Sequence, residues 1–441
     1  MMTDVTLIHA GADDALALEE RYQAAVRSGE TVAFMEAMDA GYADAPENGL
    51  LAAWHARLHY ALGEESPARA IAWGWAVPIA LLNGLVLWLL STGLTETQAA
   101  IPDFFLMWAP ASALAVLIFL AVAGRPDWLT IGLTGIGIAG LLGYTLFISG
   151  RLKQGAPDSL LGEQYGTLMA LHLPLLAVGG IGLAVLRNHN DDNNRFAFLL
   201  KTLEIVIVSG LFAIAVGLFT AITVGLFEAL NVQLPDPAMR ALILGVGGTI
   251  PVLAVAMIYD PTVAPAAQPF GDGMSKLIAL LMRGLLPLTL LVLLIYVAFI
   301  PFNFGAPFRN RDVLIVYTAM LFAVIALMAG ATPAATQFLT PVTARWLRRG
   351  MLALAVLSII VGVYALAAIG YRTWQGDWTP NRLTFIGWDV INLGVLVGVL
   401  AGLLRSEEGN WPDAVRHAFG RGIWAYAAWI ILVIVGLPLI F

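Results

Sequence analysis

Cysteine is absent from this chain of 441 residues, and charged side chains are scarce. The absence of cysteine excludes disulfide bonds, thiolate nucleophiles and cysteine-ligated metals. Charged residues make up 12% and hydrophobic residues 59% of the sequence, which would leave a water-soluble domain without enough polar surface. We also find no phosphate-binding glycine loop, catalytic serine elbow or metalloprotease helix. We therefore expect a membrane protein with no metal, no cofactor, no catalytic residue and no nucleic-acid partner.

Long apolar segments fill most of the chain after about residue 70. A hydrocarbon core of roughly 30 Å needs about 20 apolar residues per helix, and the backbone inside it must satisfy its own hydrogen bonds. The sequence therefore predicts an all-α, polytopic integral membrane protein with about 11 transmembrane helices. The expected spans are 70–92, 104–123, 128–149, 165–186, 205–230, 239–259, 277–300, 313–331, 351–370, 383–404 and 421–441.

The N-terminal segment differs from the rest of the chain in charge. Up to Pro67 it carries twelve acidic and three basic residues, a net charge of −9, whereas the whole chain carries −7. Apolar positions at helical spacing predict helices over 13–27 and 49–62. We expect a small, acidic, soluble helical segment at 1–68 and a transmembrane domain at 69–441. Because the first residues are acidic rather than basic, we expect no secretory signal peptide.

Basic residues are divided unevenly between alternate loops, which predicts the orientation. The set of loops that includes Arg57 and Arg416 holds fourteen basic residues, and the other set, which includes Arg151 and Arg382, holds seven. This bias predicts a bacterial inner (cytoplasmic) membrane protein with a cytoplasmic N-terminus and an outer C-terminus. The lipid bilayer is the expected partner.

Small residues recur every four positions in two of the expected spans. They are Ser209, Ala213, Gly217, Ala221, Gly225 and Ala229 in the fifth span, and Gly394, Gly398 and Gly402 in the tenth. Small side chains at this spacing let helix backbones approach closely in lipid. The stripes favour packing within the chain; a homo-oligomer interface and a sliding surface stay open as alternatives.

Polar residues inside the spans are the candidate functional residues, since burial of such groups in lipid is expensive. Asp389 lies about seven residues into its span, roughly 10 Å deep, and shares one helix face with Arg382 and Asn392. His172 lies at a similar depth from the same side, and Asn83 lies a little deeper. One hypothesis is a polar pocket formed by Asn83, His172, Asp389 and Asn392 that opens outward.

The competing hypothesis is that each of these polar groups finds its partner separately. Asp389 would pair with Arg382 reaching inward, and His172 would bond a carbonyl freed by Pro174. Arg382 can likewise be a purely structural interfacial residue or can bind an anion or lipid headgroup together with the helix N-terminus. Glu204 and Glu228 bound a complete span, so we expect them at opposite interfaces.

Residues 276–404 resemble an uncharacterised bacterial membrane family known as domain of unknown function 4153. The resemblance is carried by Leu286–Leu288, Tyr296, Arg372, Gly376 and Thr379–Arg382. It implies a multi-spanning inner-membrane protein, and it supplies no activity and no catalytic residue. The acidic N-terminal segment lies outside it.

Three function classes fit these observations. The first is a permease-like transporter of a small solute or lipid, supported by the number of spans, by the prolines within them and by the candidate polar pocket. The second is a non-catalytic scaffold or sensor that binds a protein partner through its acidic N-terminal segment. The third is a lipid-modifying membrane enzyme, for which only His172 and Asp389 have suitable chemistry. The sequence favours transport over the scaffold role and favours both over an enzyme.

Overall fold

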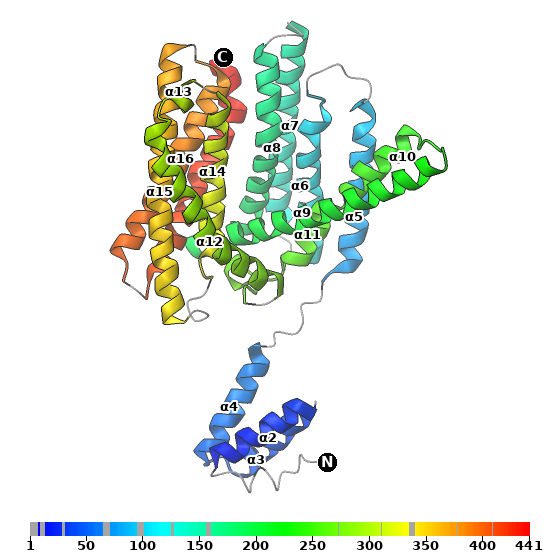
Figure 1. The fold of residues 1–441 in the computed structure, drawn as a ribbon. Helices are drawn as coiled ribbons and strands as arrows, with labels where there is room; N and C mark the ends of the chain where they lie inside the picture. Colours follow the sequence, from blue (N-terminus) through cyan, green and yellow to red (C-terminus); the bar gives the residue numbers. More distant parts are fainter. Residues whose placement is uncertain are drawn as a thin grey trace. The chain divides into compact units, whose positions relative to one another are not determined.

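The computed structural model describes residues 8, 14–28, 31–64, 71–94, 101–124, 128–155, 160–271, 273–309, 311–334, 340–376, 378–407 and 409–441. All regular secondary structure in these residues is helical, with α-helices, short 3₁₀ turns and two π-helical turns. The chain divides into two compact units, Met1–Ala70 and Ile71–Phe441 (Figure 1).

The first unit contains helices α2 (Ala15–Ser28), α3 (Thr31–Asp44) and α4 (Gly49–Glu64). Asp14 and Asn48 accept backbone N–H groups at the starts of α2 and α4, which fixes where these helices begin. The apolar faces meet in a core that includes Leu18, Met38 and Trp54. Outside the core, hydrogen bonds from Gln23 and then Arg57 hold the pKa of Glu19 below its usual value.

The second unit contains the apolar helices. Ten are long and apolar enough to cross a membrane among the residues described, and a shorter apolar stretch, Ile315–Ala331, lies within an eleventh helix. The prediction of an all-α polytopic membrane protein is confirmed. The helices are α5 (Trp73–Leu90), α6 (Phe104–Ala123), α7 (Trp128–Gly155), α8 (Leu160–Leu186), α9 (Asp192–Ala229), α10 (Asp236–Arg240), α11 (Ile250–Ile258), α12 (Gly273–Phe299), α13 (Ala306–Arg309), α14 (Arg311–Ala331), α15 (Pro341–Gln375), α16 (Pro380–Arg405), α17 (Trp411–Ile431) and α18 (Leu437–Ile440).

Two groups of helices make up this unit. Helices α5–α8 pack against one another, and α12 and α14–α17 form the second group (Figure 1). Helix α9 begins against α17 and runs obliquely to the upright helices of both groups, and its turn into α10 lies beside the end of α5 (Figure 1). Helix α9 thus belongs to both groups.

The sixth predicted span, 239–259, is interrupted in the structure. A π-helical turn at Ala241–Gly245 is followed by a break at Gly248–Thr249 before α11 begins. Pro251 explains the break, because it has no N–H to donate to the carbonyl four residues earlier. The backbone here passes very close to α5: a Cβ on Gly84 would lie 2.3 Å from the Gly245 carbonyl oxygen. Glycine at position 84 therefore allows direct backbone contact.

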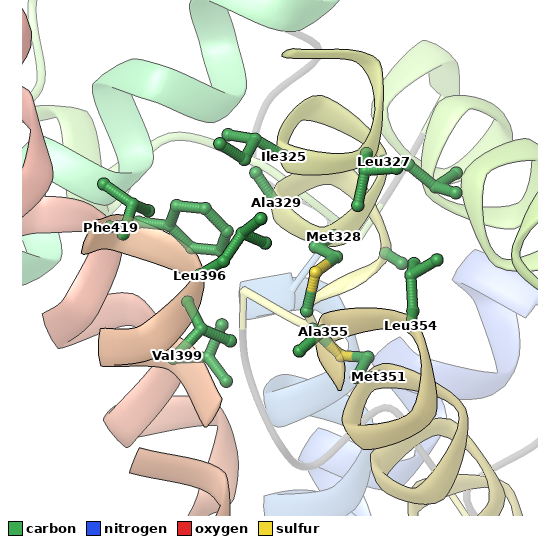
Figure 2. Packing of buried hydrophobic residues seen from close by; sticks show 14 of the residues in the cluster. Ile325, Leu327, Met328, Ala329, Met351, Leu354, Ala355, Leu396, Val399 and Phe419 are labelled. Atoms are coloured by element: carbon green, nitrogen blue, oxygen red, sulfur yellow. The ribbon is translucent and has the colours of Figure 1, made fainter. Parts of the chain in front are cut away.

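The largest apolar core lies in the second helix group. Figure 2 shows Met328 of α14, Met351 and Leu354 of α15, and Leu396 and Val399 of α16 interdigitating in it. These five side chains are fully buried. Along α14 the labelled residues Ile325, Leu327, Met328 and Ala329 lie between Thr318 and Thr332, so the packed core separates the polar groups at the two ends of this helix group.

Candidate functional site

Asp389 is a fully buried carboxyl group in the second helix group, with 0% of its surface exposed. Thr318 of α14 donates a hydrogen bond of 2.8 Å from Oγ1 to Asp389 Oδ1. Asp389 Oδ2 has no hydrogen-bond partner among the residues described. The expected pairing with Arg382 is not the one observed, because Asp389 bonds across to α14 and not back along its own helix.

Asn392 lies one turn further along α16 and is also fully buried. Tyr426 of α17 donates a hydrogen bond of 2.8 Å to Asn392 Oδ1. Within the described part of the chain, Asn392 Nδ2 has no partner. The rings of Tyr426, Trp388 and Phe322 pack against one another beside it, with centroid separations of 5.3–6.3 Å. Two adjacent turns of α16 thus each carry an unpaired buried polar atom.

His172 of α8 connects this cluster to the first helix group. Trp388 Nε1 donates to His172 Nε2 at 3.0 Å, and His172 Nδ1 lies 2.7 Å from the Leu168 carbonyl. Because the indole nitrogen can only donate, Nε2 must accept and Nδ1 must carry the hydrogen, so both bonds together require the neutral imidazole. The carbonyl is that of Leu168, not the one that Pro174 frees.

Asn83 lies in a different cluster from the other three candidates. Its Nδ2 donates to Ser112 Oγ of α6 at 3.1 Å and to the Gly248 carbonyl at 2.7 Å. It therefore supports the break between α10 and α11. The structure brings His172, Asp389 and Asn392 into one cluster and leaves Asn83 out of it.

Arg382 lines a cavity at the end of the second helix group where α16 begins. The cavity volume is about 160 Å³. Thr379 caps α16 by accepting the Arg382 backbone N–H, and Pro380 occupies the first turn. The side chains that line the cavity are Gln164, Ile315, Ile369, Arg372, Thr379, Asn381, Arg382 and Phe385.

Arg372 brings a second guanidinium group into this cavity from the last turn of α15. Its Nη1 is buried and has no hydrogen-bond partner in the described residues. The Arg382 guanidinium packs over Gly376, where an added Cβ would lie 3.0 Å from Nη1. Two guanidinium groups and the first turn of a helix make this cavity suited to an anion.

The cavity lies directly above the Asp389 cluster. Two of its lining residues, Ile315 and Phe385, precede Thr318 and Asp389 by three and four residues in α14 and α16, which run in the same direction. One helical turn, about 5.4 Å, therefore separates these lining residues from the Thr318–Asp389 hydrogen bond. Beyond the cluster, the packed core of Figure 2 closes the path.

The small-residue stripes have different surroundings. On α16, an added Cβ on Gly402 would lie 3.2 Å from Ala414 of α17, and one on Gly398 would lie 3.7 Å from Ala418. An added Cβ on Gly394 would have no neighbour within 4 Å among the described residues. On α9, Gly217 and Gly225 have no neighbour within 4 Å among the described residues, and Ala213, Ala221 and Ala229 are exposed. The α16 stripe thus packs partly on α17, and the α9 stripe is uncovered.

A second polar cluster lies at the opposite end of α14. Lys201, 2% exposed, donates to Glu204 at 2.9 Å, to Ser275 at 2.9 Å and to the Pro269 carbonyl at 3.0 Å. Ser275 Oγ donates to the same Glu204 oxygen at 2.7 Å. Glu204 is therefore buried with a partner, whereas Glu228 is exposed. Apart from the spacing of Lys201 and Glu204, no sequence pattern indicated this network.

Asp191 lies close to this end and precedes α9. The backbone N–H of Asn194 bonds its carboxylate and holds the pKa of Asp191 below its usual value. His417 of α17 pairs with the neighbouring Asp192. In the part of the chain described, no three His, Asp or Glu side chains form a metal-ligand group.

Cysteine substitution offers a direct test of the cavity, because the chain has no native cysteine. We expect Asn381→Cys, which lines the cavity, to react with a membrane-impermeant maleimide only from the face at which α16 begins. Asp389→Cys and Leu396→Cys should not react from either face, because both positions are fully buried. Reaction at position 389 in folded protein would show that the cavity continues through its lining into the cluster.

Comparison with protein-family models, with curated proteins and with solved structures finds no match.

Proposed function

We propose that this protein binds an anionic group, a small solute anion or a lipid phosphate headgroup, in the cavity lined by Arg372 and Arg382, as a permease-like membrane protein. The observation that carries the proposal is the buried Nη1 of Arg372, which no described group satisfies. A buried guanidinium N–H without an acceptor is costly, and a bound anion supplies the acceptor.

The charge and the size of the cavity fit an anionic ligand. Among the lining residues, the two arginines are the only charged side chains. The first turn of α16 adds its partial positive charge on the same side. A volume of about 160 Å³ accommodates a phosphate-sized group.

The permease-like part of the proposal rests on what lies beneath the cavity. The unpaired polar atoms of Asp389 and Asn392 continue inward from it along α16, and an apolar core then closes the path. A scaffold protein does not need unpaired polar atoms that extend inward from a cavity. The distribution of basic residues supports a bacterial inner-membrane location with the N-terminus in the cytoplasm and the cavity facing outward. The resemblance of residues 276–404 to domain of unknown function 4153 agrees with this location.

The test is anion binding by the full chain in nanodiscs of neutral lipid. We expect Arg372→Gln to weaken binding of inorganic phosphate or sulfate at least about tenfold, because a charge-assisted hydrogen bond contributes about 1.5–3 kcal/mol. Arg151→Gln is the matched control: Arg151 lies near the C-terminal end of α7, on the same predicted face, and packs on Phe147, away from the cavity.

Two further arms separate the ligand sources and test transport. Native mass spectrometry measures the binding of anionic phospholipid. If Arg372→Gln weakens this binding and free phosphate does not bind, the ligand is a lipid headgroup. Uptake of the anion into proteoliposomes would distinguish a permease from a binding protein. Equal affinity of Arg372→Gln, Arg151→Gln and wild type for every anion would refute the proposal.

A further inference from the structure

Asp389 is unusual among the carboxyl groups of this protein. It is the only aspartate that is fully buried among the residues described. The other carboxyl buried within the helices, Glu204, has Lys201 as a counter-charge and Ser275 as a second donor. Asp389 has one neutral donor, the Thr318 hydroxyl, and one oxygen with no partner.

The helices packed against α16 supply no counter-charge to Asp389. Four polar side chains on these helices have other hydrogen-bond partners. His172 bonds Leu168 and Trp388, and Tyr317 bonds Tyr296. Tyr364 bonds the Phe304 carbonyl, and Tyr426 bonds Asn392. No described cation forms an ion pair with Asp389. The surrounding helices carry Tyr165 and His172 on α8, Tyr317 on α14, Tyr364 and Arg372 on α15, Arg382 on α16 and Tyr426 on α17. The other titratable or charged residues of these helices are Glu163, Arg311, Asp312, Arg345, Arg348, Arg349, Tyr371, Arg405, Asp413, Arg416, His417 and Arg421.

We propose that Asp389 is a proton-binding site, protonated at neutral pH and able to release its proton toward the cavity above it. An unpaired hydroxyl of a neutral acid is much less costly to bury than an unpaired carboxylate. A metal cation is the weaker alternative, because only the Asp389 carboxyl and the Thr318 hydroxyl face each other here and hard cations need more oxygen ligands. In membrane proteins such isolated acids are typical of proton relays.

The proton site also gives the cavity a means of coupling, and this part of the inference rests on the proposed function. Release of the proton turns Asp389 from a neutral acid into an anion about one turn below Phe385 of the cavity. An anion held by Arg372 and Arg382 would then be repelled. A unit charge at roughly 10 Å and an effective dielectric constant of about 20 changes affinity on the order of tenfold.

The protonation state is measured by infrared difference spectroscopy on the full chain in nanodiscs. We expect the wild-type minus Asp389→Asn spectrum at neutral pH to contain the C=O band of a protonated carboxylic acid, and carboxylate bands to replace it at alkaline pH. Carboxylate bands alone at neutral pH would overturn the proposal. Glu204→Gln is the matched control and should remove carboxylate bands while leaving the acid band in place.

If Asp389→Asn does not fold, ¹³C-aspartate labelling of the wild type shifts the aspartate bands and answers the same question. Coupling is measured with sulfate, which does not titrate in this pH range. We expect wild-type affinity to fall about tenfold as Asp389 loses its proton, and Asp389→Asn to bind independently of pH. Sulfate affinity in the wild type that does not change across the acid-band transition contradicts the coupling. If no anion binds, the proposed function is refuted. The acid band still shows whether Asp389 is protonated.

Discussion

Gly387→Ala should lower the unfolding temperature of the protein sharply. Gly387 lies on α16 directly against the indole ring of Trp429 on α17, and an added Cβ would lie only 1.8 Å from the nearest ring atom. An indole packed between helices cannot move aside as the end of a flexible side chain can. Overpacking of this kind typically costs about 1–3 kcal/mol, and we expect the upper end or beyond. Scanning fluorimetry of detergent-solubilised protein measures the change.

Gly394→Ala is the matched control for this experiment. It lies on the same helix two turns further along, and an added Cβ there has no neighbour within 4 Å in the described part of the chain. The exchange is chemically identical, and alanine favours a helix, so the unfolding temperature should stay the same or rise slightly. Equal decreases in unfolding temperature for the two variants would mean that α16 does not contact Trp429 of α17 at position 387.

Lys201→Met should destabilise the protein as strongly, for an electrostatic reason. Lys201 provides the only ion pair that Glu204 makes among the described residues, and both side chains are almost completely buried. Removal of one partner from a buried pair leaves an uncompensated charge and typically costs about 3–5 kcal/mol. The same fluorimetric measurement should therefore show a large decrease in the unfolding temperature.

The double variant Lys201→Met with Glu204→Gln identifies the cause of that loss. It removes both charges, so we expect it to recover more than half of the lost stability. Lys276→Met removes a nearby exposed lysine that lines the adjacent cavity, and its effect should be small. If the double variant is no more stable than Lys201→Met, packing of the lysine stem and not charge explains the effect.

The positions of the helices could be predicted from the sequence because hydrophobic length alone determines which segments cross a bilayer. Counting residues along straight helices predicts a depth for Asp389 and for His172. Which helices are neighbours could not be predicted, because depth contains no information about lateral position. Asn83 shows the consequence: the sequence predicts that it lies only a little deeper than His172, but it bonds Ser112 of α6 and the Gly248 carbonyl, away from the Asp389 cluster.

Close backbone contacts were also beyond the sequence pattern. The regular stripe on α9 suggested packing, yet Gly217 and Gly225 are uncovered within the described chain. The tightest approach to backbone is that of Gly84 to the Gly245 carbonyl oxygen. Each of these glycines follows an alanine four residues earlier, Ala80 or Ala241, but these short repeats do not show which helix packs against which. Periodicity detects a surface that one helix offers, whereas a contact depends on two helices. The second cavity arginine, Arg372, could not be paired with Arg382 for a similar reason, since the two lie on different helices.

The seam between the two helix groups has a mechanical consequence. Hydrogen bonds from Trp388 to His172 and from Tyr144 to the Val435 carbonyl cross it, and much of the remaining contact is apolar, from residues such as Leu173 and Val433. In a bilayer, lipid chains replace apolar contacts at little cost. Rocking of one group against the other would therefore cost little more than a few hydrogen bonds, and one of them, the bond of Trp388 to His172, is made by the residue next to Asp389. Loss of that bond would change the surroundings of Asp389 at the same moment as the groups separate.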